Sequence, residues 1–465
     1  MKTDLSAQEA KFDNDELFFS ITQLDSTILS GNDVFVRISG YDETELVGSI
    51  HNIIRHPDMP RVIFKTLWDA IGSGKPLVAY VKNRTKTGEY YWVLAAVFPL
   101  GERYLSIRIK PTTALFARAR EIYFKLLMAE SRGGMEESGA LLGRLLGELG
   151  YERYEQFMSE ALLQELHARK ASLGNGCLAE KRFESSSQSL LGLKMLYDTC
   201  QSVMREYEEW YAKIGLFEEV RSGFKEKGDL LRRLARDVVF LSLNASVSSH
   251  RSCGGGETFG VLARDIRINA KENDELIGGV RVLIDDLSVG LNELIFTVSA
   301  ISLQIETILY FIEEVLCKER EEKMDQVREN VSDLIALVCE YAARCQNIQN
   351  GLLAGMTTVL KHLERLERQM LYLGYIQVYG IIEAAGESDE ATRFNVIFSE
   401  LKVLLQKTSG EIEAMQIMGE RFANENRFLI DKSAAMEGTL ARLKHESGPG
   451  PIRKKGEYNA KRRDV

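Results

Sequence analysis

The most specific short signal in the sequence is the run HNIIRHPDMP at positions 51–60, which holds two histidines, an arginine and an aspartate. Within it, Arg55 can present a charge-assisted hydrogen-bonding fork to a phosphate group. Further along the chain, the amide of Asn83 can bond the polar edge of a heterocyclic ring. Ordinary structural roles are the alternatives: His56 caps a helix, Asp58 begins one, and Asn83 satisfies a strand edge.

No catalytic motif accompanies this run. The sequence holds no P-loop, no nucleophile elbow, no kinase histidine block and no motif of cyclic-dinucleotide enzymes. Its six cysteines form no CxxC pair and no zinc spacing, which is typical of reduced thiols in the cytoplasm. We therefore expect a cytoplasmic protein that is not an enzyme and holds no metal. The remaining histidines stand singly in expected helices or at their ends: His167, His250, His362 and His445.

The net charge and the hydropathy of the chain argue against two kinds of partner, nucleic acid and the membrane interior. The net charge of −9 argues against nucleic acid, because phosphate binding needs clustered cations. The basic tail, residues 449–465, is expected to be a solvated terminus, with docking to an acidic surface as the alternative. No run of about 18 apolar residues is free of charge, so we expect no membrane span. The closest candidate, residues 297–315, is interrupted by Gln304, Glu306, Glu313 and Glu314 and is interpreted as a bundle helix.

The part of the chain that follows the N-terminus predicts a mixed α/β domain. Three runs, 77–85, 89–100 and 103–110, are rich in aromatic and β-branched residues that alternate with period two, as strands do. Gly88 and Gly101 mark hairpin turns between them. A helix is expected over residues 58–72, where apolar residues recur at helical spacing.

The rest of the chain predicts helices, in keeping with only 7 prolines in 465 residues. Residues 112–185 are interrupted by glycines and predict short helices, such as 114–129 and 154–171. From residue 186 onward, apolar residues recur every 3.5 positions, which requires supercoiled helix packing. The clearest stripe is Ile277, Val280, Ile284, Leu287, Leu291, Leu294, Val298, Ile301, Ile305, Ile308, Ile312 and Val315.

Residues 51–60, together with Gly31–Asn32–Asp33 and Ser39–Gly40–Tyr41, resemble the flavin-binding PAS domain of aerotaxis receptors. The segments VKNR at 81–84, YYWV at 90–93 and LSIR at 105–108 continue the resemblance in order. The resemblance implies a domain built of a five-stranded antiparallel sheet with helices. It also implies that this domain binds FAD non-covalently and senses redox state. The residues that the resemblance places at the cofactor are Asn32, Arg55, His56, Asp58, Asn83 and Tyr91.

One position departs from this family. Where the family has a tryptophan after Gly–x–Pro, this sequence has Leu77, which removes an aromatic contact to the flavin. The alternatives to bound FAD are a PAS fold without flavin, and haem or another ligand. Haem is disfavoured because His51 and His56 are expected in a loop and not on an apolar helix face.

Two segments of the C-terminal half resemble the hairpin turn of chemotaxis receptors. In the first, Leu243 and Phe259 stand at the spacing of the receptor motif, and an acidic–aliphatic–basic triplet lies at 265–267. In the second, Val378 and Phe394 repeat that spacing, and the triplet lies at 400–402. The two copies thus share one register, in which Leu243 corresponds to Val378 and Phe259 to Phe394, as after an internal duplication.

The tips of these two copies differ from the receptor pattern. Receptors use a tip glutamate and arginine to engage the chemotaxis kinase and its coupling protein. The first copy keeps Arg251 but has Ser248 at the glutamate position. The second copy keeps Glu383 but has Gly386 at the arginine position. Coupling to the kinase is therefore left open.

The fold class predicted is α+β: a PAS domain followed by a long all-α antiparallel four-helix coiled-coil bundle. With both hairpins in one chain, we expect an intramolecular pseudo-dimer. The domains expected are a flexible N-terminus (1–15), the PAS domain (16–111), a helical connector (112–185), a first hairpin (186–322, tip about 252–256), a second hairpin (323–446, tip about 386–391) and a disordered basic tail (447–465).

The function expected is that of a signal transducer. A flavin redox signal would pass from the strand at 103–110 through residues 112–185 to the bundle. Its partners are expected to be the chemotaxis kinase, the coupling protein or other receptors. A non-catalytic scaffold with a cofactor-free PAS domain is the alternative.

Overall fold

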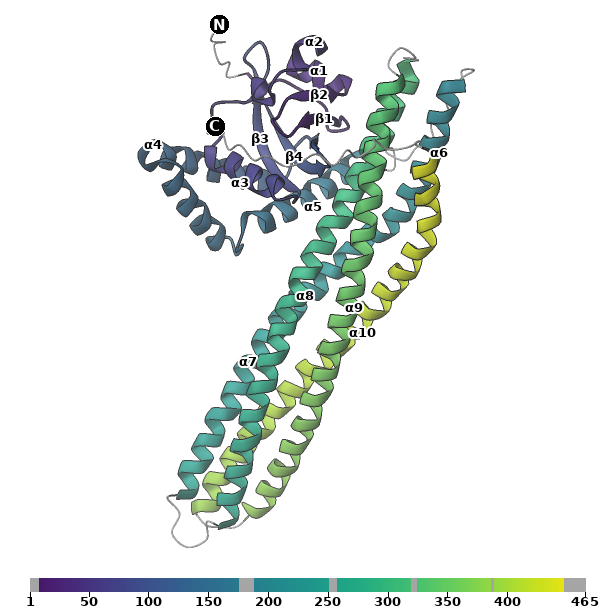
Figure 1. Ribbon diagram of the computed structural model, residues 1–465. Coiled ribbons are helices and arrows are strands. Elements are labelled where there is room, and N and C mark those ends of the chain that lie inside the picture. The colour runs from purple at the N-terminus through teal and green to yellow at the C-terminus, as the bar shows by residue number, and fades with distance from the viewer. Residues whose placement is uncertain (1–7, 175–187, 251–256, 319–323, 386–388, 447–465) are drawn as a thin grey trace. The chain divides into compact units, whose positions relative to one another are not determined.

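The computed structural model describes residues 8–174, 188–250, 257–318, 324–385 and 389–446 (Figure 1). The basic tail, the first half of the predicted N-terminal segment and the two predicted tips, with Arg251 and Gly386, lie outside these ranges, except for residues 389–391. Five strands form one antiparallel sheet in the order β2-β1-β5-β4-β3. Their bounds are β1 Phe18–Gln23, β2 Ile28–Gly31, β3 Leu77–Arg84, β4 Tyr90–Leu100 and β5 Arg103–Ile109.

Glycine turns set the register of the last three strands. Gly88 has φ 95° between β3 and β4, and Gly101 has φ 61° between β4 and β5, conformations that an L side chain rarely adopts. With the turns fixed, Asn83 pairs with Tyr91, and Ala95 pairs with Arg108. Both predicted hairpin turns are therefore present.

Strand alternation gives the sheet two faces with different neighbours. The register places Ser20, Leu77, Asn83, Tyr91 and Arg108 on one side, here called the inner face. Neighbouring positions in the strands point to the opposite side, here called the outer face; they include Phe19, Tyr80, Trp92, Phe98 and Arg103.

Short helices cover the inner face. They are α1 Asp33–Ser39, α2 Glu43–Leu46, the 3₁₀ helix η1 His51–Ile54 and α3 Arg61–Gly72. Helix α1 begins at the N-cap Asn32 and ends at Gly40, which adopts the left-handed conformation.

Two further helices, α4 Ala114–Glu148 and α5 Tyr154–Leu173, lie against the outer face. Helix α4 is kinked at Gly134, whose φ of 74° interrupts the helical backbone. The ring of Trp92 packs against Phe116, and the hydroxyl of Tyr80 donates to Glu165 at 2.9 Å.

Long antiparallel helices make up the rest of the described chain, as the heptads predict. They are α6 Gln188–Ala212, α7 Ile214–His250, α8 Glu257–Lys318, α9 Met324–Glu383 and α10 Asp389–Glu446. The predicted fold class, a five-stranded antiparallel sheet followed by long packed helices, is confirmed.

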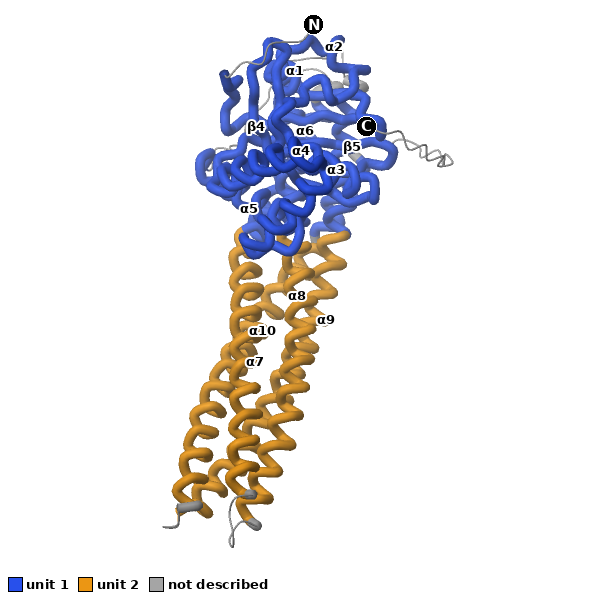
Figure 2. The backbone as a smooth tube through the Cα atoms, turned by 90° about the vertical axis from the view of Figure 1, so that its left-hand side faces the viewer, with its two compact units in different colours: residues 1–211, 296–343, 435–465 blue, residues 212–295, 344–434 orange. Residues whose placement is uncertain are grey.

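The chain forms two compact units (Figure 2). The first holds the sheet, helices α1 to α6, and parts of three long helices: residues 296–318 of α8, 324–343 of α9 and 435–446 of α10. The second holds residues 212–295 and 344–434.

Within the second unit, four helical segments pack as a bundle. Phe217 of α7 contacts Phe422 of α10, Arg344 of α9 pairs with Glu293 of α8 at 2.6 Å, and the Asn426 amide donates to the Gln349 carbonyl at 2.8 Å. These contacts link α7 to α10, α10 to α9 and α9 to α8.

The register between the two predicted copies also relates positions in this bundle. Phe259 and its equivalent Phe394 stack on each other, with ring centroids 4.2 Å apart and planes 5° apart. A pair of equivalent side chains in mutual contact is what a two-fold relation between the copies produces. Other equivalent positions are buried in both copies: Leu241 and Ile376, Ile266 and Leu401, and Ile277 and Ile412.

Among the described residues, one helix is long and apolar enough to span a membrane, the segment 258–317 of α8. Its most apolar stretch is 83% buried inside the protein. Residues 296–312 are almost entirely buried all round, since the first unit surrounds them with protein. A core helix enclosed on every side needs an apolar surface all round, so burial accounts for its composition.

Candidate functional site

A cluster of polar side chains lies on the inner face, centred on Arg108 of β5. The guanidinium donates to the Ser20 hydroxyl at 3.0 Å, and it lies 2.5 Å from the Nε2 of His51 on η1. The His51 ring stacks on Phe35 of α1. Strand alternation turns Ser20 and Arg108 inward, and η1 brings His51 over them.

The charges in this cluster are unbalanced. Arg108 is only 3% exposed, and no carboxylate among the described residues forms an ion pair with it. Burial lowers the pKa of Arg108 to about 10, so it stays protonated at neutral pH. Burial, and after it the charge of Arg108, lowers the pKa of His51 to about 3. His51 is therefore neutral, and its Nε2 accepts from Arg108.

Asn83 and Tyr91 stand directly opposite each other on β3 and β4, beside this charge. Asn83 is 3% exposed and Tyr91 is fully buried. The Nδ2 atom of Asn83 and the hydroxyl of Tyr91 have no hydrogen-bond partner in the described part of the chain. Burial raises the pKa of Tyr91, opposed by Arg108 and by the Asn83 amide, so the hydroxyl keeps its proton. Two buried donors are thus left for another acceptor.

Aromatic rings surround these polar groups. Phe12 contacts Phe18 and Tyr91, with ring centroids 5.8 Å and 6.5 Å away, and Phe18 stacks on Phe35. The Arg108 guanidinium lies over Phe35 and Phe18, 5.4 Å and 5.7 Å from their centroids. The inner face thus combines buried donors with aromatic rings, the two kinds of group that line sites for planar ligands.

The six residues expected at a cofactor do not all gather here. Asn83 and Tyr91 do. Asn32 is committed elsewhere: its Oδ1 accepts from the backbone of Phe19 and Phe35, and its Nδ2 donates to the Leu17 carbonyl at 3.0 Å.

Unlike His51, residues 55–58 of the run 51–60 lie at the edge of β3. Arg55 forms a backbone bridge with Asn83, but its guanidinium lies over the Phe64 ring at 3.9 Å. Asp58 pairs with Lys82 at 2.7 Å.

His56 accepts from the Asp58 backbone at 3.1 Å, and its ring packs on Tyr90. Burial lowers the pKa of His56. Lys82 and Tyr90 belong to the outer-face set by strand alternation. The structure therefore separates His56 and Asp58 from the pair Asn83 and Tyr91.

Leu77 lies on the inner face, 2% exposed. The position where the family has a tryptophan thus belongs to the same face as Asn83, Tyr91 and Arg108. The aromatic contact that Leu77 lacks would be made at this face.

A second polar set, on helix α1 and strand β5, has its partners on the long helices of the first unit. The Asp33 backbone donates to Glu314 of α8 at 2.9 Å, and Asn32 also reaches this carboxylate at 3.4 Å. On the outer face, Arg103 pairs with Asp333 of α9 at 2.7 Å.

Aromatic contacts accompany these polar ones. The ring centroid of Phe19 lies 5.0 Å from that of Phe311 on α8, and that of Phe98 lies 5.5 Å from that of Tyr341 on α9. The sheet is therefore bound directly to α8 and α9.

Sequence reasoning missed Arg108 and His51 as members of the inner cluster. The alternation in LSIR, residues 105–108, places Arg108 on the side of Ser106 and opposite Ile107. An arginine within a predicted strand was the available signal for Arg108. The sequence alone does not say that helices cover the face of the sheet on which Arg108 lies.

Comparison with known proteins supports the fold described above. A family model described as the PAS fold matches residues 28–106. The N-terminal sheet and its inner helices form a PAS domain. The aerotaxis receptor of Escherichia coli (strain K12) is 38% identical over 124 residues, which are 26% of this chain and 24% of the receptor. The predicted resemblance of the PAS region to this receptor is confirmed.

Solved structures that the chain matches include two LOV proteins. The light-state structure of the blue-light photoreceptor Aureochrome1 LOV is 23% identical, and the match covers 22% of this chain and 84% of that one, with a TM-score of 0.20. The Rhodobacter sphaeroides LOV protein is 16% identical, and the match covers 30% of this chain and 90% of that one, with a TM-score of 0.21.

The match to the aerotaxis receptor spans about a quarter of that receptor's length. The activity of the whole receptor is therefore a property of that protein and is not assigned to this chain by the match. For this chain, the resemblance of the long helices to receptor hairpins stays a prediction.

Proposed function

We propose that this chain is a signal transducer that holds FAD at the inner face of its PAS domain, senses redox state or oxygen, and passes the signal to a helical bundle like that of chemotaxis receptors. One observation carries the proposal. A single sheet presents buried donors that find no acceptor among the described residues on its inner face, and it binds long helices with its outer face. A change at one face therefore has a short path to the other.

The donor set of the inner face fits the flavin ring. The ring has a carbonyl-bearing edge of hydrogen-bond acceptors and flat apolar faces. Asn83 Nδ2 and the Tyr91 hydroxyl are donors that lack acceptors in the part of the chain that the structure describes, and Phe18 and Phe35 are aromatic neighbours on the same face. The flavin supplies the redox chemistry when bound, and these residues bind and orient it.

The proposed path to the long helices is shorter than the route expected through residues 112–185. Strand β5 carries Arg108 on its inner side and Arg103 on its outer side, and Arg103 pairs with Asp333 of α9. Helix α1, which packs over the inner face, has its N-terminus bound to Glu314 of α8. We propose these two contacts as the path of the signal, with α4 and α5 bracing the sheet.

We propose further that the two hairpins form a pseudo-dimer within one chain. The stacking of Phe259 on Phe394 and the burial of equivalent positions in both copies support it. A receptor-like hairpin normally buries its apolar seam against a second hairpin, and here that hairpin belongs to the same polypeptide.

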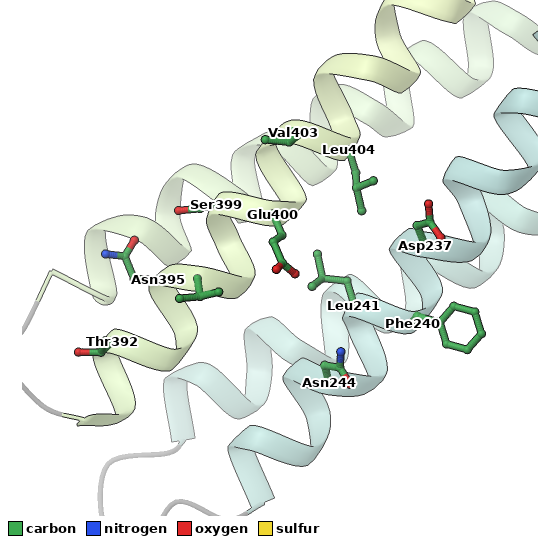
Figure 3. Close-up of a pocket in the computed structure, with 11 residues that line it drawn as sticks. Asp237, Phe240, Leu241, Asn244, Thr392, Asn395, Ser399, Glu400, Val403 and Leu404 are labelled. Atoms are coloured by element: carbon green, nitrogen blue, oxygen red, sulfur yellow. The ribbon is translucent and has the colours of Figure 1, made fainter.

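Partner binding is proposed for the bundle segments that flank the predicted tips. A groove between α7 and α10, lined by residues that include Phe240, Asn244, Glu400 and Val403, lies in this part of the second unit (Figure 3). Exposed apolar residues there occupy equivalent positions in the two copies, which supports a shared role in contacting a kinase, a coupling protein or another receptor. The pairs are Phe240 and Tyr375, Leu243 and Val378, Val247 and Ile382, Val261 and Val396, and Ile268 and Val403.

The visible spectrum of the purified full chain tests the flavin proposal. Yellow protein with flavin absorption bands, either as purified or after FAD is added, is the expected result. Colourless protein that stays colourless with added FAD contradicts the proposal and favours the scaffold alternative. Leu77 on the inner face is the observation that favours this second function, because it removes an aromatic surface for the ring.

A further inference from the structure

Buried arginines in the described part of this protein have unequal partners. Arg169 of α5 is 2% exposed and donates to Glu306 of α8 at 2.8 Å and 3.0 Å. It also bonds the backbone carbonyls of Asn14 and Asp15. Arg108 is 3% exposed and has no carboxylate partner among the described residues. Among the described residues, a carboxylate therefore pairs with Arg169 and none pairs with Arg108.

The neighbours of Arg108 are neutral groups. They are the Ser20 hydroxyl, the neutral His51 ring and, at 3.5 Å, the Ser106 carbonyl. Hydrogen bonds and ring faces lower the cost of burying the guanidinium but leave its net charge in place. A buried charge without a counter-charge destabilises a fold, and such charges are usually paired.

We propose that Arg108 is a ligand-binding residue of the inner face, and that with Tyr91 and Asn83 it selects a planar ligand whose edge is rich in acceptors and able to carry negative charge. This inference rests on the proposed flavin function and deepens it, since it names Arg108 as the residue whose positive charge favours negative charge on the edge of the bound flavin ring. The three side chains are all buried, all donors, and all on one face of the sheet. An acceptor edge placed among them would satisfy the two donors that have no acceptor among the described residues, and it would also offset the charge of the guanidinium.

The test uses the full chain and the variant Arg108→Met, which keeps much of the side-chain length and removes the charge. Without ligand, this variant should protect the amides of β1 and β5 from hydrogen exchange as well as the wild type or better, because an uncompensated charge has gone. With FAD as the probe, its affinity should fall by about 10- to 100-fold, the effect of losing a hydrogen bond to a charged group. Arg108→Lys, which keeps the charge and loses the fork, should recover part of the affinity.

Arg169→Met is the matched control. It removes an arginine of the same burial whose charge is paired, so it should lower the protection of the neighbouring segments by taking from Glu306 its arginine partner. If Arg108→Met lowers protection of β1 and β5 in the same way, Arg108 is a structural residue and the inference is overturned.

The outcomes separate this inference from the proposed function. If the wild type binds FAD and Arg108→Met binds it equally well, the inference fails and the flavin function stands. If the wild type takes up no FAD, the flavin function fails, and the exchange comparison still decides whether Arg108 is an uncompensated charge. Equal or greater protection in Arg108→Met supports that claim, and lower protection contradicts it.

Discussion

Arg103 and Arg108 belong to the same strand, β5, and face opposite sides of its sheet. Arg103 is paired with Asp333 at 2.7 Å and Glu329 at 3.4 Å, both on α9. Arg108 is surrounded by a serine, a neutral histidine and aromatic rings. The outer face therefore contains its own counter-charges, as a permanent interface does. The described residues give Arg108 no counter-charge on the inner face, as expected where the partner is a separate molecule.

The same contrast holds for polar atoms without charge. On the outer face, the Tyr80 hydroxyl donates to Glu165, which also accepts from the backbone of Thr112 at 2.7 Å. On the inner face, Tyr91 and Asn83 keep donors that find no acceptor in the described chain. At Tyr80 and Glu165 the outer face satisfies its hydrogen-bonding groups within the chain, whereas at Asn83 and Tyr91 the inner face leaves two donors open among the described residues.

The largest expected effect on stability comes from removing a buried ion pair on the outer side. Glu306→Ala removes the carboxylate that pairs with Arg169 and leaves a buried guanidinium without its counter-charge. Breaking a buried ion pair in this way costs about 3–5 kcal/mol of stability. Urea unfolding followed by circular dichroism should show a markedly lower midpoint. Glu340→Ala, at an exposed position of α9, is the control and should leave the midpoint nearly unchanged.

The second expected effect is a pH dependence of stability that arises from His51 on the inner side. The folded-state pKa of His51 is about 3, below its ordinary 6.5, so the unfolded chain binds a proton that the folded domain does not. Stability from this group is present above pH 6.5 and is lost as the pH falls from 6.5 towards 3. His51→Gln, which keeps an acceptor for Arg108, should weaken this decline.

The measurement for His51 is hydrogen exchange of β1 and β5 between pH 7 and pH 5, corrected for the intrinsic effect of pH on exchange. His56 has a lowered pKa as well and contributes to the same slope, so the variant should reduce the decline without removing it. An unchanged decline in His51→Gln would mean that the ring is not enclosed beside Arg108. His362→Gln, on α9, serves as the control.

The smallest effect has the opposite sign and belongs to the outer side. Burial, reinforced by Glu329 and opposed by Arg103, raises the pKa of Asp333 above its usual 3.8. The folded protein then holds a proton more tightly than the unfolded chain, so stability from this group falls as the pH rises through the window just above 3.8. Asp333→Asn lacks the titrating group. As the pH rises through that window, the urea midpoint of the wild type should therefore fall relative to that of the variant. A rise of the wild-type midpoint relative to the variant would contradict the raised pKa of Asp333.

Local patterns in the sequence predicted most of the secondary structure. Gly88 and Gly101 marked the turns that set the register of β3, β4 and β5, because each needs a positive φ. The heptads marked the long helices, because an apolar period of 3.5 positions is typical of supercoiled helices. Strands β1 and β2 were not located one by one, since they are short and lie among irregular segments.

The candidate site was predicted only in part. Asn83 and Tyr91 were found because the resemblance to the PAS family placed them at the cofactor, and the hairpin register brings them together. Asn32 carried the same expectation, but its side chain caps α1 and reaches Glu314, a residue 282 positions away. Arg108 was not assigned to the cofactor, because only the folded chain encloses its face of the sheet.

Turns, strand alternation and heptad stripes could be inferred from the amino-acid sequence alone, because each depends on residues within a few positions of one another. The folded arrangement was needed to learn which face of the sheet meets α8 and α9, and which face holds a charge that no described carboxylate pairs with. Counter-charges and acceptors such as Asp333 and Glu314 lie far along the chain from the groups they bind, and no local rule connects them. Whether a buried charge is neutralised depends on what folding places within a few ångströms of it.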